Sequence, residues 1–321
     1  MNFALIVDKC KVASYHVKDN KAYKFAGHKT DIPYEFHHSV NNECFMGYWG
    51  YPFVFNGCFL NWSEWKELPK LDLDVIFVSI ESQFDKCRIS DLRKKYPNAT
   101  IIGYPKESWN WEQTWRQRID VLNQCDKVII LLENYSTLSG LQEFCTKKIE
   151  WLPQPVNIDY LYNNFYKEER HDSIFAYDIT WNNPRRGSTL KFAQYLANKY
   201  NIELVHVNTQ NEKNQWHEFL KHWTNSTFHI NCDPVSTFVG QQATQCAALG
   251  VIQIGGVNES HFKLFPDTAT NDFGILESKF EEYLNNYDSR VSAMQYAYTK
   301  ATQIYSYDAV RTKLKKILKT L

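Results

Sequence analysis

The sequence has no long hydrophobic run and no paired-cysteine motif, and each absence narrows the class of protein. Its first apolar run covers residues 3–7 and ends at Asp8 and Lys9, so it is too short for a signal-peptide core or a membrane span. The eight cysteines never form a C-x-x-C pair, which argues against a zinc site, and a chain of 321 residues needs no disulfide staples. We therefore expect a soluble protein with reduced thiols and no membrane partner, located in the cytoplasm (the host cytoplasm, if it is viral).

The chain also lacks an excess of either charge. Lys plus Arg and Asp plus Glu both number 36, which gives a formal net charge of zero. Proteins that bind nucleic-acid backbones in bulk usually carry a positive excess, so this balance argues against that class but leaves room for a local basic groove. Hydrophobic residues make up 44% of the sequence and aromatic residues 16%. The length therefore suits two domains, each with a core of its own.

Short apolar runs alternate with helical patterns, which is typical of parallel sheets with crossover helices. Strands are predicted in the first half at 3–7, 75–80, 100–103 and 127–132, with helices at 90–96 and 112–123. Residues 19–69 are rich in Gly, Asn, His and aromatics, and predict irregular structure or a small antiparallel insertion.

A turn-rich passage at residues 152–157 separates the halves, and the alternation then restarts. Strands are predicted at 173–179, 203–207, 227–231, 251–254 and 273–275, and helices at 189–199, 214–224, 241–249, 279–286 and 291–321. This order predicts an α/β chain of two facing doubly wound, Rossmann-like domains. In such sheets ligands bind at the carboxyl ends of the strands, where loops and helix N-termini converge.

The most informative segment covers residues 233–254. Its pattern predicts a strand end, a polar loop, a helix of small residues, and a glycine before an apolar strand. Backbone N–H groups at such a helix N-terminus, joined by Ser236, Thr237 and Gln241, would form an anion site, and Gly240 would let a phosphate approach closely. The alternative is an ordinary strand–loop–helix crossover.

This segment resembles the donor-binding signature of family 4 of the GT-B glycosyltransferases. In that signature two glutamates flank a Gly-Phe-Gly loop, ahead of a small-residue helix, a glycine and an apolar strand. Thr237 falls on the first glutamate, which touches the donor sugar, and Gln245 falls on the second, which holds the nucleotide ribose. Gly240 falls on the second loop glycine. Because an amide also pairs with hydroxyls, the resemblance implies ribose binding through Gln245.

Three further stretches resemble the same family in the same order. Residues 151–160 resemble its interdomain segment, residues 184–187 its basic-Gly turn, and residues 305–310 the start of its closing helix. The resemblance covers about residues 125–321 and implies a GT-B fold whose last helix crosses back to the first domain. The expected parts are an acceptor-side domain at 1–155, a nucleotide-sugar donor domain at 156–290, and a C-terminal helix at 291–321.

Three charged side chains are candidates for catalysis. Arg186, with Arg185 beside it, would clamp the donor diphosphate and stabilise charge on the departing nucleotide. A solvated surface is the alternative for this pair. Lys106 and Glu107 follow a predicted strand and are candidate sugar or acceptor contacts, with a surface turn as the alternative.

Two other motifs bear on ligands. Gly255-Gly256 follows a strand end and either lines the donor cleft near the base or sugar, or forms a plain glycine turn. Asp72-Leu73-Asp74 could be mistaken for the metal-binding D-x-D of the GT-A fold. That motif belongs at the end of a strand, whereas this pair precedes the strand predicted at 75–80. We therefore predict an approach turn here, and no metal site or metal requirement.

The resemblance implies a retaining glycosyltransferase, either a hexosyl- or a pentosyltransferase, with a UDP-sugar as the default donor. Two acceptors stay open: a glycan or small hydroxyl compound, and a hydroxymethylated base such as hydroxymethylcytosine in duplex DNA. Phage-type DNA glycosyltransferases, which modify such bases, are soluble GT-B proteins of similar size. A flipped base would need aromatic stacking and a basic rim. The candidate platform aromatics are Trp49, Tyr51, Trp62, Trp65, Trp109, Trp111 and Trp115, with core packing as the alternative. The candidate rim residues are Lys9, Lys11, Lys18, Lys21, Lys24, Arg116 and Arg118.

Two other classes remain open. The replacement of both family glutamates favours a non-catalytic GT-B relative that binds a nucleotide sugar. A sugar epimerase also uses a two-lobed nucleotide-sugar cleft.

Overall fold

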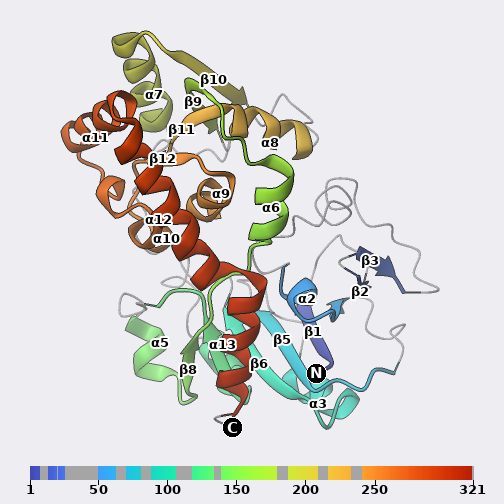
Figure 1. Ribbon diagram of the computed structural model, residues 1–321. Helices are drawn as coiled ribbons and strands as arrows, with labels where there is room; N and C mark the ends of the chain where they lie inside the picture. The colour runs from blue at the N-terminus through green and yellow to red at the C-terminus, as the bar shows by residue number, and fades with distance from the viewer. Residues whose placement is uncertain are drawn as a thin grey trace. The chain divides into compact units, whose positions relative to one another are not determined.

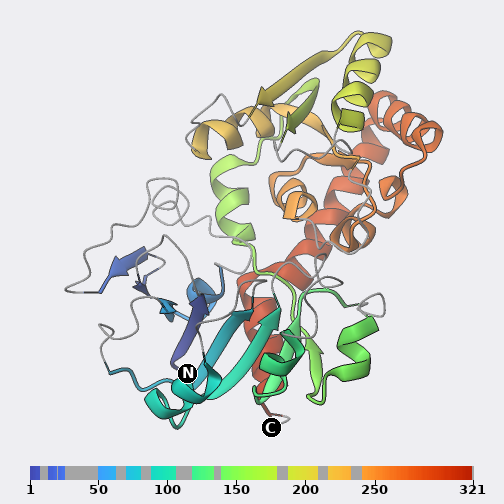
Figure 2. The ribbon, with the colours of Figure 1, turned by 180° about the vertical axis from the view of Figure 1, so that it is seen from behind.

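The chain folds into two compact units. The computed structural model describes residues 1–7, 14–19, 21–25, 50–62, 70–80, 88–105, 118–133, 139–178, 187–208, 216–232 and 241–319. Unit 1 comprises Met1–Asn157 and Tyr307–Leu321, and unit 2 comprises Ile158–Ser306 (Figures 1 and 2). The C-terminal segment expected at 291–321 is therefore divided between the units, because the chain returns to unit 1 at Tyr307.

Unit 1 is built on a mixed sheet. Its described strands follow the order β3-β2-β4-β1-β5-β6-β7-β8. Pairing is parallel from β4 through β1 to β8, whereas β2 runs antiparallel to both β3 and β4. Irregular structure or a small antiparallel insertion was expected at residues 19–69; of the described residues there, β3 pairs antiparallel with β2, whereas β4 pairs parallel with β1. The strands are β1 (Phe3–Val7), β2 (Tyr15–Lys18), β3 (Lys21–Lys24), β4 (Cys58–Asn61), β5 (Val75–Ile80), β6 (Thr100–Pro105), β7 (Lys127–Ile130) and β8 (Ile149–Trp151).

The central strands of unit 1 are apolar along their whole length because both faces of the sheet are covered. All five residues of β1 and all six of β5 are buried. Such continuous apolar strands are typical of parallel sheets. In register, Leu5 lies between Phe59 of β4 and Phe77 of β5, which places aromatic rings on either side of it.

The last helix belongs to unit 1 and is held there by three cations. Lys127 Nζ donates to Ile317 O at 2.7 Å, and Arg311 Nε donates to Val54 O at 2.9 Å. Lys313 Nζ lies 3.1 Å from the centre of the Trp151 ring. The predicted return of a C-terminal helix to the first domain is confirmed (Figure 1). The described helices of this unit are α2 (Tyr51–Val54), α3 (Ile89–Lys95), α5 (Ser139–Phe144) and α13 (Tyr307–Lys319).

Unit 2 contains a parallel sheet of the order β10-β9-β11-β12 within its described residues. Its strands are β9 (His171–Asp178), β10 (Glu203–Asn208), β11 (Ser226–Ile230) and β12 (Ile252–Ile254). Its helices are α6 (Ile158–Phe165), α7 (Gly187–Tyr200), α8 (Trp216–Asn225), α9 (Gln241–Leu249), α10 (Glu259–Leu264), η5 (Pro266–Thr268), α11 (Phe273–Asn285) and α12 (Tyr287–Tyr305).

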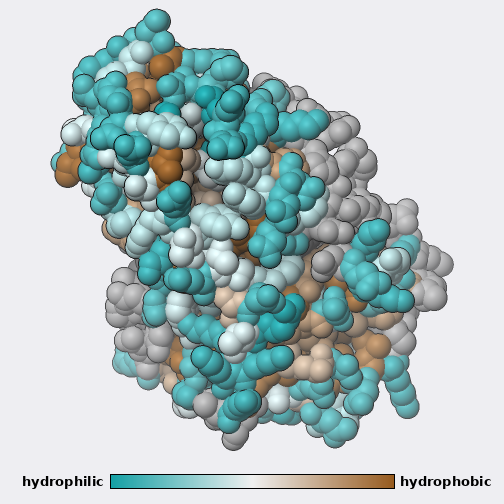
Figure 3. Space-filling model, viewed as in Figure 1, coloured by the Kyte–Doolittle hydropathy of each residue, from teal (hydrophilic) through white to brown (hydrophobic). Residues whose placement is uncertain are grey.

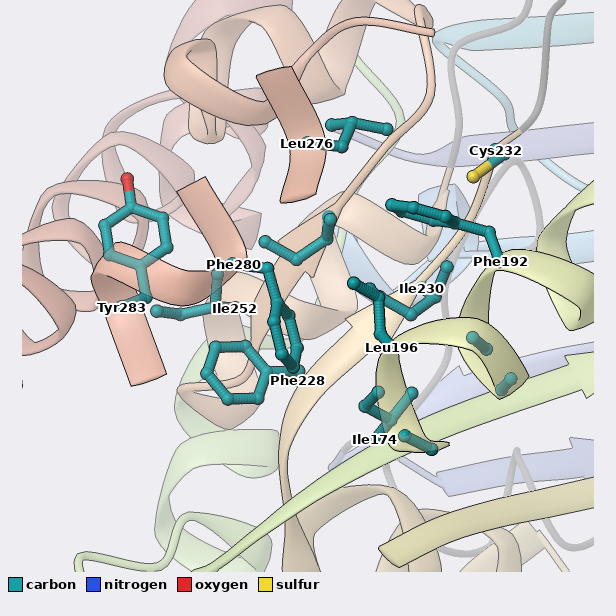
Figure 4. Packing of buried hydrophobic residues seen from close by; sticks show 14 residues of the cluster. Ile174, Phe192, Leu196, Phe228, Ile230, Cys232, Ile252, Leu276, Phe280 and Tyr283 are labelled. Carbon is teal, nitrogen blue, oxygen red and sulfur yellow. The ribbon is translucent and has the colours of Figure 1, made fainter. Parts of the chain in front are cut away.

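The strands of unit 2 bury different side chains on their two faces. Figure 4 shows one face, where Phe228 of β11 and Ile252 of β12 pack with Leu196 of α7 and Phe280 of α11. Because successive strand residues alternate between faces, the neighbours of these residues point the other way. There Phe175 of β9 stacks on Trp223 of α8, with ring centres 5.4 Å apart. His229 of β11 lies on this second face, 4.8 Å from the Trp223 ring centre.

Two predicted elements of unit 2 differ from the structure. The strand predicted at 273–275 is wrong, because these residues form the first turn of α11. Asp272 caps that helix by accepting from the N–H groups of Gly274 and Ile275. The single helix predicted at 291–321 is two helices, since Ser306 adopts an extended conformation between α12 and α13 (φ −61°, ψ 156°).

Candidate functional site

The carboxyl edge of the unit 2 sheet gathers polar and glycine residues. All four strands run parallel, so their carboxyl ends meet at one edge. There β11 continues into Asn231 and Cys232, and β12 continues into Gly255 and Gly256. Helices α7 and α9 also begin after strand ends, so their N–H-rich first turns face the same edge. This is the place where doubly wound domains bind their ligands.

The two glycines let the chain pass closely over the end of β11. Both have positive φ values, 88° for Gly255 and 98° for Gly256. A Cβ atom at these positions would lie 2.9 Å and 3.0 Å from Asn231 O, respectively. Both glycines are buried, and Gly255 N–H donates to Thr268 O at 3.1 Å. The close backbone crossing is sufficient to explain why both residues are glycine. A contact between these glycines and the donor stays a prediction.

A buried histidine links this edge to helix α9. His229 Nδ1 lies 3.1 Å from Phe175 O, and because a carbonyl oxygen only accepts, Nδ1 carries a proton. Nε2 lies 3.4 Å from Gln242 Oε1, and because both atoms are acceptors in this neutral tautomer, the two side chains are in contact without a hydrogen bond. The amides of Gln242 and Asn231 also hydrogen-bond to each other. His229 therefore packs beside two half-buried amides that hold each other at the start of α9, next to the end of β11.

A second buried histidine supports the turn after β12. His261 Nδ1 lies 3.2 Å from Gln253 Nε2, and its Nε2 lies 3.2 Å from Thr268 Oγ1. Thr268 Oγ1 donates to Gln253 O at 2.6 Å, so it accepts from His261 Nε2. Asn258 caps α10 by accepting from His261 N–H at 2.9 Å. His261 is fully buried, so it supports the glycine turn from beneath and does not line an open cleft.

Burial keeps both rings neutral. It lowers the pKa of His229 to about 4 and that of His261 to about 3. Neither ring can therefore act as a general acid or base near pH 7, where catalytic groups need pKa values close to the operating pH. Their role is to hold hydrogen-bond partners in place.

Acid should therefore destabilise the chain through these two groups. The unfolded state binds more protons below the ordinary histidine pKa of about 6.5, so folding stability is full above that pH and falls as the pH drops toward 4. We expect a loss of about 2 kcal/mol per histidine at pH 5. Urea unfolding from pH 7.5 to 5 measures it. His229→Gln and His261→Gln should each flatten the pH dependence by that amount, whereas His222→Gln on the exposed side of α8 should leave it unchanged. Equal slopes for all three variants would refute this assignment.

The predicted donor residues fall into two groups. Gln241 is half-buried at the start of α9, and Gln245, one turn further on, is only 5% exposed. The other candidates lie outside the described residues: Arg185, Arg186, Ser236, Thr237, Gly240, Lys106 and Glu107.

Sequence reasoning missed four residues of this edge: Thr189, His229, Asn231 and Gln242. Thr189 Oγ1 in the first turn of α7 accepts from Cys232 N–H at 3.0 Å, which ties the helix to the end of β11. Asn231 could have been found from its position directly after a strand. The pairing of His229 with Gln242 had no local signal, because it depends on which face of β11 meets α9.

Hydrogen bonds and burial decide several of the site predictions made for unit 1. Asp74 directly precedes β5 and accepts from Asn2 N–H at 2.6 Å, which confirms the approach turn. Tyr51 and Trp62 belong to the core and are not platform residues. Tyr51 OH donates to Pro153 O at 3.1 Å. Arg118 is 2% exposed and is therefore not part of a basic rim. The remaining platform candidates, Trp49, Trp65, Trp109, Trp111 and Trp115, lie outside the described residues, as do Lys9, Lys11 and Arg116.

The described part of the chain shows neither a metal cluster nor a membrane span. Within the described ranges, no three His, Cys, Asp or Glu side chains are grouped so that they could hold a metal ion. No helix there combines the length and apolar character needed to cross a bilayer. The five cysteines in those ranges are not in disulfides: Cys58, Cys125, Cys145, Cys232 and Cys246.

Two α/β units, with a C-terminal helix that returns to the first, define the GT-B fold of glycosyltransferases. Solved structures agree with this class. HepE (Alr3699) from Anabaena, in complex with UDP and glucose, matches with a TM-score of 0.55 at 8% identity, over 77% of this chain and 78% of that one. An alpha-glucosyltransferase in complex with UDP-glucose and DNA containing an abasic site matches with a TM-score of 0.55 at 10% identity, over 82% of this chain and 85% of that one.

The same alpha-glucosyltransferase activity appears in a third structure, in complex with UDP and a 13-mer DNA containing a HMU base. It matches with a TM-score of 0.54 at 11% identity, over 82% of this chain and 85% of that one. The sequence itself matches no protein-family model and no curated protein. The fold is therefore established through structure.

Proposed function

We propose that the chain is a retaining glycosyltransferase that moves a sugar from a nucleotide-sugar donor, a UDP-sugar by default, to the hydroxyl of a hydroxymethylated base in duplex DNA. The observation that carries the donor half is the carboxyl edge of the unit 2 sheet. There Asn231 contacts both Gln242, at the start of α9, and the Gly255-Gly256 turn. Neutral amides and a helix N-terminus can bind the hydroxyls and phosphates of a nucleotide sugar.

The reaction breaks the bond between the anomeric carbon and the β-phosphate oxygen of UDP. A new bond forms between that carbon and the acceptor oxygen, and the acceptor proton leaves with the UDP or to water. Negative charge grows on the departing diphosphate, so fixed donors aimed at it lower the barrier. In this proposal Arg186, with Arg185, supplies a guanidinium there, and the loop from Ser236 to Gly240 supplies backbone N–H groups. Lys106 and Glu107 are the proposed acceptor-side contacts.

The choice of acceptor rests on two supports. The matched alpha-glucosyltransferase has been solved with DNA, and most of both chains is covered by the match. Unit 1 also carries exposed lysines on an antiparallel hairpin, at Lys18 and Lys21. A glycan or small hydroxyl compound is the alternative acceptor, and it requires no basic surface.

Nucleotide release from UDP-, GDP- and ADP-sugars tests the donor half of the proposal. We expect release from a UDP-sugar and a sugar joined to the acceptor. Donor affinity without release would identify a non-catalytic GT-B relative, a class favoured by the loss of both family glutamates. Release, or sugar interconversion, with no glycosylated product would identify epimerase-type chemistry. Either of these outcomes would contradict the proposal.

Gln245 tests the ribose contact. Gln245→Ala should raise the KM for the UDP-sugar about fivefold, the effect of one lost neutral hydrogen bond of about 1 kcal/mol, with little change in kcat. Gln245→Glu places a carboxylate where the family has one and should keep or lower the KM. Gln194→Ala, an exposed glutamine of α7 in the same unit, is the matched control. Because Gln245 is buried, thermal unfolding of each variant separates lost affinity from lost fold. An unchanged KM in folded Gln245→Ala would remove this residue from the donor site.

A further inference from the structure

The β2–β3 hairpin forms the outer end of the unit 1 sheet. Its strands pair antiparallel, with Lys18 opposite Lys21 next to the turn and His16 opposite Tyr23 one step further along. β3 is the edge strand, and β2 pairs with β4 only through Tyr15 and His16. The turn end of the hairpin, which carries both lysines, therefore extends past the strand-to-strand pairing with β4.

The two faces of this hairpin have opposite characters. Tyr15 and Val17 are buried in the core of unit 1, and Tyr15 stacks on Phe59 with ring centres 5.1 Å apart. The pleat places Lys18, Lys21, His16 and Tyr23 on the other face. Both lysines are exposed, and Tyr23 is 44% exposed. Figure 3 shows hydrophilic residues over this hairpin. Lys24, opposite Tyr15, belongs to the inner face and is only half-exposed.

Aromatic rings continue the exposed face away from the lysines. His16 stacks on Tyr23, with ring centres 5.6 Å apart and planes at 23°. Phe25 also lies against this histidine, with ring centres 5.4 Å apart. The exposed face, made by Lys18, Lys21, His16 and Tyr23, is therefore a row of two cations followed by a stacked aromatic pair.

Folding stability does not account for this arrangement. Like charges directly opposite each other on a sheet are destabilising. Lysine at an unpaired strand edge blocks edge-to-edge aggregation, but this role does not require two lysines directly opposite each other. Asp19 in the turn offsets one charge, and Lys18, Lys21 and Lys24 still leave the hairpin with a net charge of +2. An anion bound between the two facing lysines would offset the repulsion between their charges.

We propose that this face binds the sugar–phosphate backbone of duplex DNA, with Lys18 and Lys21 on phosphates and Tyr23, held by His16, packed against a deoxyribose. Most protein–DNA hydrogen bonds go to the backbone, where they position the duplex without reading its sequence. The inference rests on the proposed function, because it assigns the acceptor side of the reaction to duplex DNA. It also explains how a chain with no net charge binds a polyanion, because the positive charges are concentrated on this face.

Fluorescence anisotropy of a labelled duplex, measured over a range of salt concentrations, tests the inference. Each phosphate contact contributes about one unit to the slope of log Kd against log salt. Lys18→Gln/Lys21→Gln should therefore lower the slope by about two. Lys70→Gln/Lys94→Gln, the same charge change on exposed lysines of unit 1, should leave it unchanged. Tyr23→Ala should weaken binding about tenfold with an unaltered slope.

Nucleotide release from the UDP-sugar, measured in the presence of saturating duplex that contains hydroxymethylcytosine, separates this inference from the proposed function. If the hairpin variant loses DNA affinity while the chain turns over no donor, the proposed reaction fails and the DNA surface stands. If the wild-type chain does not bind duplex DNA, or if the two double variants have equal slopes, the inference is overturned. Binding that depends on Lys18 and Lys21 but is seen only with anionic lipid vesicles also overturns it.

Discussion

Arg170→Met is expected to destabilise unit 2 by about 2–4 kcal/mol, because it removes charged hydrogen bonds from a buried helix end. The Arg170 guanidinium donates to the carbonyl oxygens of Leu249 and Gly250, and its Nε donates to Lys167 O at 2.9 Å. Leu249 is the last residue of α9, so its carbonyl has no partner within the helix. Burial lowers the pKa of Arg170 to about 10, which leaves the group charged at pH 7 and favourably placed at a helix C-terminus.

Urea unfolding gives the loss of stability, and hydrogen exchange of the α9 amides shows whether it begins at this helix. Arg170→Lys should recover part of the loss, because it restores the charge but not the planar fork of donors. Lys279→Met removes a cation from an exposed i,i+3 pair with Glu282 in the same unit and should cost no more than about 0.5 kcal/mol. If Arg170→Met and Lys279→Met are equally mild, α9 is held by apolar packing alone.

Gly57→Ala is expected to cost unit 1 about 2–4 kcal/mol, because an added Cβ would overlap the backbone of a core strand. The Cβ would lie 2.4 Å from Phe3 O. The backbone around Gly57 has little freedom to move away. Gly57 N–H donates to Pro52 O at 2.8 Å, and Gly57 O accepts from Val17 N–H at 2.8 Å. Phe3 is held in turn by Phe55 and Phe77, each with ring centres 4.8 Å away.

The control for Gly57→Ala is Gly274→Ala in α11. The nearest atom to an added Cβ there is Asp272 Oδ1 at 3.3 Å, and alanine favours the helix, so we expect a change within about 1 kcal/mol of zero. Thermal and urea unfolding of both variants decides the matter. A Gly57→Ala protein as stable as the control would mean that the β1–β4 contact is looser than the structure has it.

The sequence predicted the elements whose hydrophobic pattern matched their environment. Helix α9 was predicted with the bounds that it has, because its small residues lie between a polar loop and a glycine. Strands β1 and β5 were predicted equally well, since both are apolar throughout and bounded by polar residues. The short apolar run at 273–275 favours a strand when taken alone, but the capping carboxylate of Asp272 starts a helix there.

Less of the candidate site could be predicted from the sequence. The sequence predicts either a donor contact or a plain glycine turn at Gly255 and Gly256; the structure has a close backbone crossing there, and the donor contact stays a prediction. The contact of His229 with Gln242 was not predicted, since it joins a strand to the helix that follows it and depends on the face that each presents. The lysines of the hairpin were identified as a group, but the register was needed to separate Lys18 and Lys21 from Lys24, which lies on the inner face.

This chain shares only 8–11% identity with its structural neighbours and yet has their fold. Parallel sheets require apolar strands, crossover helices and tight turns at strand ends, and many sequences satisfy these demands. In doubly wound domains, function depends on a few side chains at the carboxyl edges of the sheets. The proposed function is therefore tested most directly by measuring the reaction itself.

The most direct test is mass spectrometry of a duplex oligonucleotide containing one hydroxymethylcytosine, incubated with the chain and UDP-glucose. The matched control is the same duplex with an unmodified cytosine. The account predicts UDP release that depends on the modified duplex, and a mass gain of one hexose on the modified base. UDP released equally with both duplexes, with no mass gain on either, would contradict it.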